Sequence, residues 1–345
     1  MDPLTHALAG SAAARVAWSR HLAGAALLPG VLGALLPDVD ALIRSEADPL
    51  LYAQYHRHFT HSLAFIPIGG MVASLPWLAA RRSRARWPLY FGAASVGYAT
   101  HGLLDASTTY GTLLFWPFSD ARVAWNAIAI VDPLFTLVLL AGLAGAVWRR
   151  SAGPAGVALI ACVLLLTAGV IQRDRASRIQ EQLAERRGHA SVRGAVFPGF
   201  GTNIIWRSLY QTPDDTLHMD RLRLPWFGDP SVRDGPRAML VRAARLPEHV
   251  RADARRLRDF RRFQWFTGQW VAWAPFEEGL IGDARYSESP DRFEPVWGIR
   301  FPRGATPAVE WVDRSRGRRL DVRTLWNEVR GIDPRYQSLR GYKRR

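Results

Sequence analysis

The chain has 345 residues, of which 48% are hydrophobic and 22% charged, and its formal net charge is +15. The length allows two domains, and the average hydropathy is that of an ordinary soluble protein. The single cysteine, Cys162, excludes an intrachain disulfide and a thiolate zinc cluster. The positive charge comes almost wholly from arginine, and the basic residues are scattered without a nucleic-acid-binding motif. We therefore expect membrane lipid, and no nucleic acid, as the partner of these arginines.

The average hides a division of the chain near Gln172, because apolar residues crowd the first half and charged residues the second. We predict an all-α, polytopic bundle of membrane helices over residues 1–172. A polar linker helix is expected over residues 173–190, and a C-terminal β-rich (α+β) extramembrane domain with a basic tail over residues 191–345. No basic residue precedes the first apolar stretch, so a cleaved signal peptide is not expected.

About six apolar segments are candidates for membrane spans. The first is short, and Pro29-Gly30 interrupts the second, so we expect these two to span or to fail together as a helical hairpin. The six segments cover residues 4–18, 21–36, 63–80, 88–104, 130–148 and 154–171.

Histidines and aspartates gather at the ends of these segments. The stretch His56-Arg57-His58-Phe59-Thr60-His61-Ser62 directly precedes an apolar run, and His101 and Asp105 are spaced to share one face of a helix. His6, after Thr5, and Asp38 with Asp40, after Pro37, are of the same kind. Neutral imidazole and carboxylate are ligands of zinc, manganese and similar ions. The sequence therefore predicts a metal centre in the membrane-embedded half.

Alternating the six segments across a membrane places these candidate ligands together on one side. The arginines that follow the first, third and fifth segments fall on the other side, which the positive-inside rule makes cytoplasmic. We therefore expect a multi-pass protein whose metal site and C-terminal domain face the periplasm or the exterior. Residues on the predicted outer side are His6, Asp38, Asp40, the 56–61 loop, His101, Asp105 and Asp132.

Several of these motifs also have a plainer interpretation. His61 is the best candidate ligand of its loop and His56 follows, whereas His58 could be solvated, and the loop as a whole could be pH-sensitive or face lipid headgroups. His101 with Asp105 could be a hydrogen-bonded pair that satisfies a helix end. Four further alternatives stay open: a Pro-Asp turn at Asp38 and Asp40, a core role for His6, a helix start at Asp132, and for Arg57 either an anionic group such as phosphate or a pairing with Asp105 or lipid.

Beyond Ser191 the pattern changes to short aromatic and β-branched runs separated by Pro, Gly and Asp. The runs Thr202 to Tyr210, Trp270 to Trp273 and Val296 to Phe301 predict strands. Arg237 to Arg262 is more helical in pattern. For the basic tail, Arg314 to Arg345, contact with lipid headgroups and disorder are both open.

Four motifs carry a resemblance to a known family. They are Met1-Asp2-Pro3-Leu4-Thr5-His6, Pro37-Asp38-Val39-Asp40, His56-Arg57 with Thr60-His61-Ser62, and His101-Gly102-Leu103-Leu104-Asp105. In this order they resemble the bacterial membrane-bound metal-dependent hydrolase family that includes the YdjM-type inner-membrane proteins, itself thought to be distantly similar to zinc-dependent phospholipase C and P1-type nucleases. The resemblance covers the first half of the chain and implies a bacterial inner-membrane location. It also implies metal roles for His6, Asp38, Asp40, His56, His61, His101 and Asp105, and leaves His58 outside the pattern.

The expected function is that of a hydrolase with one or more divalent ions, zinc favoured over manganese, acting on a phosphoester of a lipid or lipid-linked substrate. Asp40 or Asp105 is expected to act as general base and Arg57 to hold an anionic group. One alternative is a non-catalytic membrane protein that senses metal or protons and binds a partner. A metal transporter is a third interpretation, which predicts ionisable residues near the middle of spans rather than at their ends. The substrate, the number of ions and the oligomeric state do not follow from the sequence.

Overall fold

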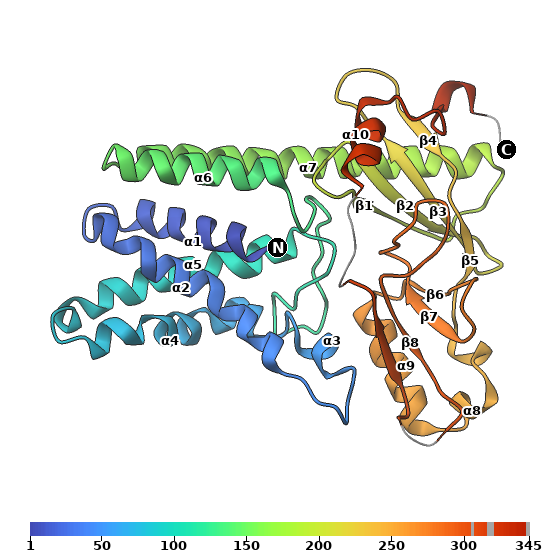
Figure 1. The fold of residues 1–345 in the computed structure, drawn as a ribbon, viewed down its shortest axis with the longest axis horizontal. Coiled ribbons are helices and arrows are strands. Elements are labelled where there is room, and N and C mark those ends of the chain that lie inside the picture. The colour runs from blue at the N-terminus through green and yellow to red at the C-terminus, as the bar shows by residue number, and fades with distance from the viewer. Residues whose placement is uncertain (305–306, 316–320, 343–345) are drawn as a thin grey trace. The chain divides into compact units, whose positions relative to one another are not determined.

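The chain folds as two units, one helical and one rich in strands (Figure 1). The computed structural model describes residues 1–304, 307–315 and 321–342. Unit 1 comprises Met1–Ile43 and Tyr55–Val170, and unit 2 comprises Arg44–Gln54 and Ile171–Arg345.

The six predicted apolar segments of the first half all contain an α-helix. The last apolar segment and the polar stretch predicted as a linker helix over residues 173–190 form one continuous helix, which ends at Arg186. The α-helices of this half are α1 Pro3–Ala17, α2 Leu27–Leu35, α3 Leu51–Tyr55, α4 Ile66–Ala79, α5 Trp87–Ala106, α6 Pro133–Trp148 and α7 Gly153–Arg186. Short 3₁₀ helices lie between them: η1 Ala23–Ala26, η2 Leu36–Leu42, η3 Phe59–His61, η4 Leu63–Phe65 and η5 Arg84–Arg86.

An aspartate followed by proline starts two of these helices. The Asp2 side chain accepts from the backbone N–H of Thr5 at the start of α1, and the Asp132 side chain accepts from that of Phe135 at the start of α6. Proline at the first helical position fits because it has no N–H to leave unsatisfied. Asp132 is therefore the N-terminal cap of α6, as its plainer interpretation predicted.

Glycines allow the backbones of α1, α2 and α5 to touch. A Cβ on Gly30 would lie 2.5 Å from the carbonyl oxygen of Gly10, and a Cβ on Gly97 would lie 2.2 Å from the carbonyl oxygen of Gly30. Small residues at such crossings are the usual means of packing helices in a membrane, where apolar burial between helices gives no driving force. The same packing brings the ends of α2 and α5 together, where the candidate ligands lie.

The described residues contain two helical stretches long and apolar enough to cross a membrane, Ala23–Leu42 and α7, or three if the bent pair Leu51–His61 and Leu63–Ala79 is one span. Six spans were predicted. The count is lower because α1 and α6 are short, and because α5, though long enough, carries His101 and Asp105 and several other polar residues. The finding therefore supports a membrane-spanning helical half without establishing every segment as a span.

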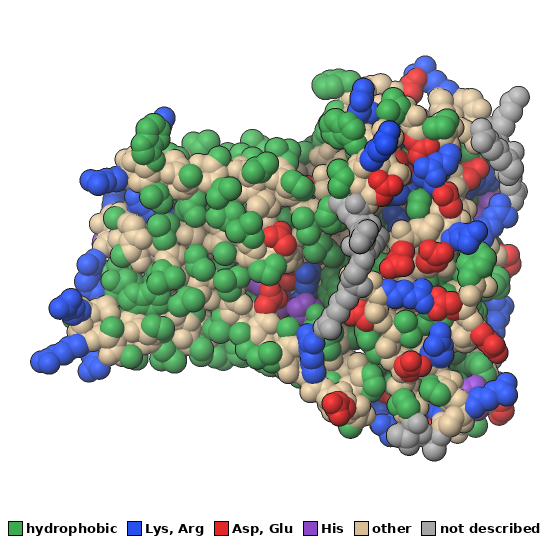
Figure 2. Space-filling view, in the orientation of Figure 1, with side chains coloured by type: hydrophobic (Ala, Val, Ile, Leu, Met, Phe, Trp, Pro, Cys, Tyr) green, Lys and Arg blue, Asp and Glu red, His purple; other side chains and the backbone are tan. Residues whose placement is uncertain are grey.

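The surface of unit 1 is that of a membrane-embedded bundle. Figure 2 shows hydrophobic side chains covering the helical half on the visible face, with Lys and Arg gathered at one end. Exposed arginines follow the C-terminal ends of α1, α4 and α6, and these helix ends lie together in Figure 1. Exposed apolar side chains on the helices include Leu28, Ile68, Val72, Leu75, Leu137, Leu140, Val157, Ile160, Val163 and Leu164.

Unit 2 is built on two antiparallel sheets, in agreement with the predicted sheet-rich C-terminal region. In the larger sheet the strand order is β1-β2-β3-β4-β10, with β5 paired to β3, and in the smaller sheet it is β6-β7-β8-β9. The strands are β1 Arg193–Pro198, β2 Ile205–Gln211, β3 Thr216–Arg223, β4 Ser231–Arg233, β5 Arg237–Met239, β6 Val271–Trp273, β7 Leu280–Asp283, β8 Trp297–Arg300, β9 Glu310–Asp313 and β10 Gln337–Ser338. The remaining elements are η6 Ala243–Arg245, α8 Glu248–Arg251, α9 Ala254–Phe266, α10 Val322–Arg330 and η7 Leu339–Gly341.

The alternation of side chains along β2 gives the larger sheet two buried faces. Trp206 packs with Ala176 and Leu183 of α7, whereas Leu209 packs with Trp270 and other residues of the second core. The polar end of α7 is therefore a structural part of unit 2. Of the predicted basic tail, residues 321–342 form α10 and β10, and residues 316–320 and 343–345 lie outside the described residues.

Candidate metal centre

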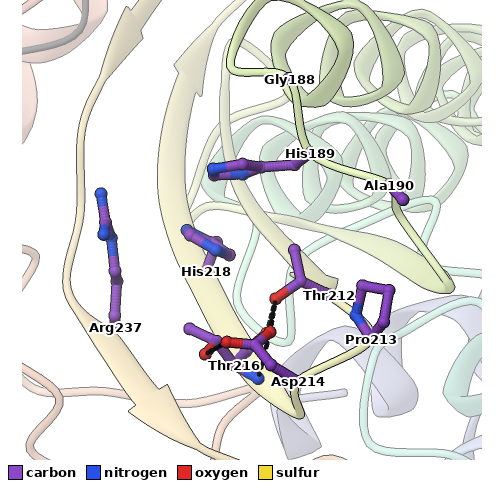
Figure 3. A pocket seen from close by; sticks show the side chains of 9 residues that line it. All are labelled: Gly188, His189, Ala190, Thr212, Pro213, Asp214, Thr216, His218 and Arg237. Carbon is purple, nitrogen blue, oxygen red and sulfur yellow. Dashed lines mark hydrogen bonds between the residues drawn. The ribbon is translucent and has the colours of Figure 1, made fainter.

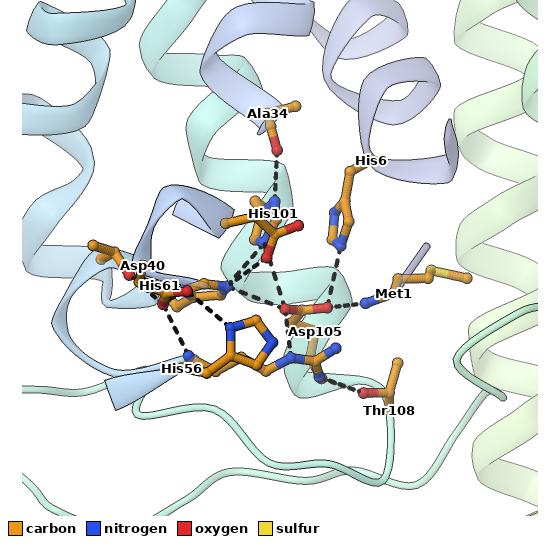
Figure 4. Close-up of polar contacts among 12 residues, drawn as sticks. Met1, His6, Ala34, Asp40, His56, His61, His101, Asp105 and Thr108 are labelled. Atoms are coloured by element: carbon orange, nitrogen blue, oxygen red, sulfur yellow. Dashed lines mark hydrogen bonds and ion pairs between the residues drawn. The ribbon is translucent and has the colours of Figure 1, made fainter. Parts of the chain in front are cut away.

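Three elements at one end of unit 1 bring the candidate ligands together (Figure 4). Asp38 and Asp40 lie on η2, His61 ends η3, and His101 and Asp105 lie on the last turns of α5. The side chains of His101 and Asp105 are one helical turn apart and point the same way, as their spacing predicts. These side chains meet at the end of the unit opposite to the exposed arginines.

The first group consists of Asp38, His61, His101 and Asp105, each of which offers a ligand atom within 4.8 Å of the others. The Nε2 atoms of the two histidines are 2.9 Å apart. They lie 3.3 and 3.4 Å from Asp105 Oδ2, and each lies 3.5 Å from Asp38 Oδ1. A tetrahedral zinc with ligands at about 2.0–2.2 Å separates its ligand atoms by about 3.3–3.6 Å. The four histidine–carboxylate spacings fall in this range, and the two Nε2 atoms are closer together than such an ion would hold them.

The protonation of His101 follows from its other ring nitrogen. Its Nδ1 lies 2.5 Å from the carbonyl oxygen of Ala34, an atom that only accepts, so Nδ1 carries the proton and donates it. In a neutral ring the Nε2 lone pair then points at the centre. A carbonyl behind the ring is the usual arrangement for a metal-binding histidine.

His61 is fixed in the same way by Asp40. Its Nδ1 lies 3.1 Å from Asp40 Oδ2 and 3.0 Å from the Thr60 hydroxyl, which itself donates to Asp40. The Nδ1 proton of His61 therefore points away from the centre, and when the ring is neutral its Nε2 lone pair points toward His101. Two lone pairs 2.9 Å apart repel each other unless a cation lies between them. The residues present therefore fit a divalent ion.

A buried oxygen of Asp105 lies beside the same two rings. Asp105 Oδ2 accepts no hydrogen bond of good geometry from any residue that the structure describes. It nevertheless lies 3.0 Å from Arg57 Nε and close to both Nε2 atoms of the first group. Buried carboxylates are stable only when paired or bound to a metal.

A second group shares Asp38 with the first and adds Asp40 and His56. His56 Nδ1 lies 2.8 Å from Asp40 Oδ1. The Asp38 side chain is 31% exposed, whereas those of His61, His101 and Asp105 are almost fully buried, so Asp38 marks the open side of the centre. A carboxylate common to two groups has the position of a bridge between two ions.

Asp40 holds the surrounding segment in place. Besides the two imidazoles, its oxygens accept from the backbone N–H of Arg57 at 3.0 Å and from the hydroxyl of Thr60 at 2.8 Å. Arg57 has a φ of +63°, a left-handed conformation that is costly for a residue with a side chain and that this hydrogen bond helps to maintain. Asp40 therefore orients both histidines of the loop.

Arg57 balances the charge of the centre. Its Nε lies 3.0 Å from Asp105 Oδ2, its Nη1 donates to the hydroxyl of Thr108 at 2.9 Å, and its guanidinium lies 4.8 Å from the centre of the Tyr110 ring. Only 5% of the residue is exposed. Of the alternatives for Arg57, pairing with Asp105 is the contact that the structure contains.

The other predicted residues lie around the centre rather than in the two groups. His6 Nε2 is 3.2 Å from Asp105 Oδ1, and its ring stacks on that of His101 with centroids 3.7 Å apart. The amino nitrogen of Met1 contacts the same oxygen of Asp105. His58 packs against Tyr55 and Trp116 and belongs to neither group.

Sequence reasoning missed the groups that orient the ligands. The carbonyl of Ala34 carries no sequence signal, since every residue has one. Thr60 and Thr108 flank His61 and Asp105 closely enough in sequence to have been named as partners. Tyr98, whose hydroxyl donates to the carbonyl of Thr60 at 2.5 Å, lies one turn before His101 on α5 and could have been found from that spacing.

A second histidine cluster lies in unit 2, at a pocket of about 330 Å³ (Figure 3). The His218 ring packs between His189 and Tyr210, with centroids 4.5 and 4.7 Å away. Burial, then His189, Arg237 and Arg187, lower the pKa of His218 to about 3. The pocket is lined by Gly188, His189, Ala190, Thr212, Pro213, Asp214, Thr216, His218 and Arg237.

Comparison with known proteins identifies the family of the helical half. No curated protein and no solved structure matches the chain. The family model for the YdjM inner membrane protein matches residues 1–176, which hold every residue of both candidate metal groups. With its candidate spans, this match makes the chain a membrane protein. The match covers more than half of the sequence, and the chain belongs to the YdjM inner membrane protein family.

Proposed function

We propose that this protein is a membrane-bound, metal-dependent hydrolase whose centre is formed by Asp38, His61, His101 and Asp105. The observation that carries the proposal is the approach of two imidazole Nε2 atoms to 2.9 Å while the Nδ1 atom of each ring is committed as a donor. A cation between the two Nε2 atoms would stabilise this arrangement. Four ligands of this kind suit zinc first and manganese second.

A bound divalent ion would supply a Lewis acid that lowers the pKa of water and polarises the scissile bond. Within the chain, His61, His101 and Asp105 hold the closed side of the site. Asp38, on the open side, is the carboxylate that a substrate meets first, and it could accept a proton there. Both oxygens of Asp40 are already hydrogen-bonded, so we assign it to positioning rather than to the base role first expected.

The proposed substrate is a phosphoester of a membrane lipid or of a lipid-linked compound. A centre at the end of a bundle with an apolar surface lies within reach of the headgroup region of a bilayer. The shared position of Asp38 allows a second ion beside Asp40 and His56 if that ion replaces the hydrogen bond between these two side chains, and pairs of ions suit phosphoester displacement. Arg57, held by Asp105, adds positive charge beside the centre.

The proposal includes an orientation and a domain assignment. The exposed arginines at the ends of α1, α4 and α6 favour a cytoplasmic location for that end of the bundle, so the metal centre would face the periplasm or the exterior. This orientation corresponds to six spans over residues 1–172, and the sides of the later segments stay the same if the first two segments fail together as a hairpin. The polar part of α7 and residues 191–345 would then form an extramembrane domain on the same side as the centre.

The test is metal content, followed by activity. Detergent-purified wild type is compared with His61→Ala and with the double variant His101→Ala, Asp105→Ala by mass spectrometry, after each is shown to fold. We expect about one or two zinc or manganese ions per wild-type chain and loss of the ions from both variants. Metal-loaded wild type should then release phosphate or a headgroup from a panel of phosphoester lipids, and a wild type that remains metal-free after reconstitution would overturn the proposal.

One further observation favours a second candidate, a non-catalytic metal- or proton-sensing membrane protein. A proton shared between the Nε2 atoms of His61 and His101 would also relieve their repulsion. Asp38 decides between the two, because a ligand set with an open side suits catalysis and a closed one suits a structural site. Metal binding without hydrolysis of any phosphoester lipid would support the sensing role.

A further inference from the structure

The helix α7 changes from apolar to polar residues at Gln172. Residues 153–171 of α7 are apolar, and several of their side chains, including Val157, Ile160 and Val163, are more than half exposed, as on a helix that faces lipid. At 1.5 Å per residue this stretch is about 28 Å long, close to the thickness of about 30 Å of the hydrocarbon core. Arg149 and Arg150 precede the helix and Arg173 and Arg175 follow its apolar part. The bilayer boundary therefore falls within about one turn of Gln172.

The first polar turn of α7 holds two loops of unit 2. The side-chain nitrogen of Gln172 donates to the carbonyl oxygens of Asn203, in the β1–β2 loop, and of Leu224, after β3, at 3.2 and 2.9 Å. Arg175 donates to the carbonyl oxygen of Pro225 at 3.1 Å and to the side-chain oxygen of Gln172. Gln172 is itself fully buried. Both loops are therefore tied to the helix at the level of the bilayer boundary.

These two loops expose aromatic side chains. Phe227 is 94% exposed, the highest value among the exposed large hydrophobic residues described, and Trp226 and Phe200 are 41% and 44% exposed. The Arg175 guanidinium lies 6.0 Å from the centre of the Trp226 ring. Full exposure of a phenylalanine to water is unfavourable, whereas aromatic rings with nearby arginines are typical of the membrane interface.

The opposite ends of the same strands have a different character. The β2–β3 turn carries Thr212, Pro213 and Asp214, and the Asp214 carboxylate accepts from two threonine hydroxyls. Since β2 has seven residues, this turn lies about 23 Å from the aromatic loops along the strand. The loops at the Gln172 end of β2 and β3 are therefore aromatic, and the turn at the other end of these strands is polar.

We propose that the β1–β2 and β3–β4 loops form a membrane anchor of unit 2, in which Phe200, Trp226 and Phe227 insert into the lipid headgroup region beside the exit of α7. The occupant of this surface is the bilayer that α7 crosses. The anchor holds the larger sheet with the Gln172 end of β2 at the lipid and the β2–β3 turn away from it. This proposal depends on α7 as a span and is independent of the proposed hydrolase activity.

Site-specific fluorescence tests the anchor. In a Cys162→Ala background, single cysteines replace Phe227, Phe200 or, as the matched control at the far end of the same strands, Pro213. Each is labelled with an environment-sensitive fluorophore and reconstituted into phosphatidylcholine vesicles with and without spin-labelled lipid. We expect blue-shifted emission and quenching by the spin-labelled lipid at Phe227 and Phe200, and quenching by aqueous iodide alone at Pro213. Equal behaviour of the Phe227 and Pro213 probes would overturn the proposal.

A measurement on the wild type covers the case in which a labelled variant fails to fold. Hydroxyl-radical footprinting in the same vesicles compares oxidation of Phe227 with that of Phe276, which is 64% exposed on a loop after β6. The anchor requires Phe227 to be protected although its side chain is the more exposed of the two. Stronger oxidation of Phe227 than of Phe276 would show that the loop is in water and would reject the anchor.

Discussion

Both units contain a cluster of histidines, and the two clusters differ in the groups that contact each imidazole ring. His61 has Asp40 behind its Nδ1 atom, and His101 has the carbonyl of Ala34, so an oxygen orients each ring. His218 is stacked between His189 and Tyr210, and its charged neighbours are Arg237, Arg187 and, with a smaller and opposite effect, Asp214. The first surroundings favour a cation between the rings, and the second disfavour positive charge on the ring itself.

Clustered histidines therefore do not by themselves make a metal centre. Oxygen acceptors behind the rings decide which nitrogen carries the proton, and carboxylates beside the rings supply the negative charge that an ion needs. Unit 1 has both features. In unit 2 the carboxylate that lines the pocket, Asp214, is occupied by the hydroxyls of Thr212 and Thr216.

The largest effect should come from removing one imidazole of each cluster. His61→Ala removes a ligand, and we expect it to weaken metal binding by more than about 100-fold. Changing a residue that only hydrogen-bonds to a ligand costs about 10- to 100-fold. His218→Ala, the matched change in unit 2, should leave the metal content unchanged. Titration of the apo-protein with zinc in detergent measures both. A metal loss of the same size in His218→Ala would mean that the ion is bound outside the candidate centre.

A smaller loss is expected from Asp40→Asn, which keeps the shape of the side chain and removes its charge. The amide can accept at one atom only, so it cannot hold both His56 and His61 as the carboxylate does. We expect metal affinity to fall by about 10- to 100-fold with the fold retained. Competition with a chelator of known affinity gives the value, and an unchanged affinity would show that the orientation of the rings does not depend on Asp40.

The identities of the candidate ligands could be read from the sequence, because histidines and aspartates at the ends of apolar segments are costly unless they have a task. The pairing of His101 with Asp105 followed from helical spacing, and the strands β2, β6 and β8 followed from their short aromatic and β-branched runs. Such local patterns can be predicted from sequence because each depends on only a few neighbouring residues.

Long-range contacts could not be read in this way. The carbonyl of Ala34 meets His101 across 67 positions of sequence, and that contact depends on the glycine crossing of α2 with α5. The continuity of α7 was also missed, since a change from apolar to polar residues looks like a boundary although the helical pattern continues. Composition marks where the surroundings of a helix change, and it does not mark where the helix ends.

Gly102→Ala tests the close approach that places His61 beside α5. A Cβ on Gly102 would lie 2.3 Å from the carbonyl oxygen of His61, so the η3 segment must shift to admit it. We expect a loss of stability of about 1–3 kcal/mol together with weaker metal binding. Gly24→Ala is the matched control, because no described atom lies within 4 Å of the added Cβ. Thermal unfolding in detergent with and without zinc measures both effects, and equal behaviour of the two variants would contradict the role given to this contact.

The smallest effect concerns pH and unit 2. Since burial and the positive neighbours lower the pKa of His218 from 6.5 to about 3, the folded chain binds a proton there less readily than the unfolded chain does. The contribution of His218 to the free energy of unfolding is therefore constant above about pH 6.5 and falls as the pH is lowered from 6.5 toward 3. His218→Phe, which keeps a ring against Tyr210 and cannot be protonated, should lose less stability than wild type over that window, while the two should run parallel above it. Denaturant unfolding followed at several pH values gives the difference between the two proteins, and parallel curves down to pH 4 would show that His218 accepts a proton in the folded chain as easily as in the unfolded one.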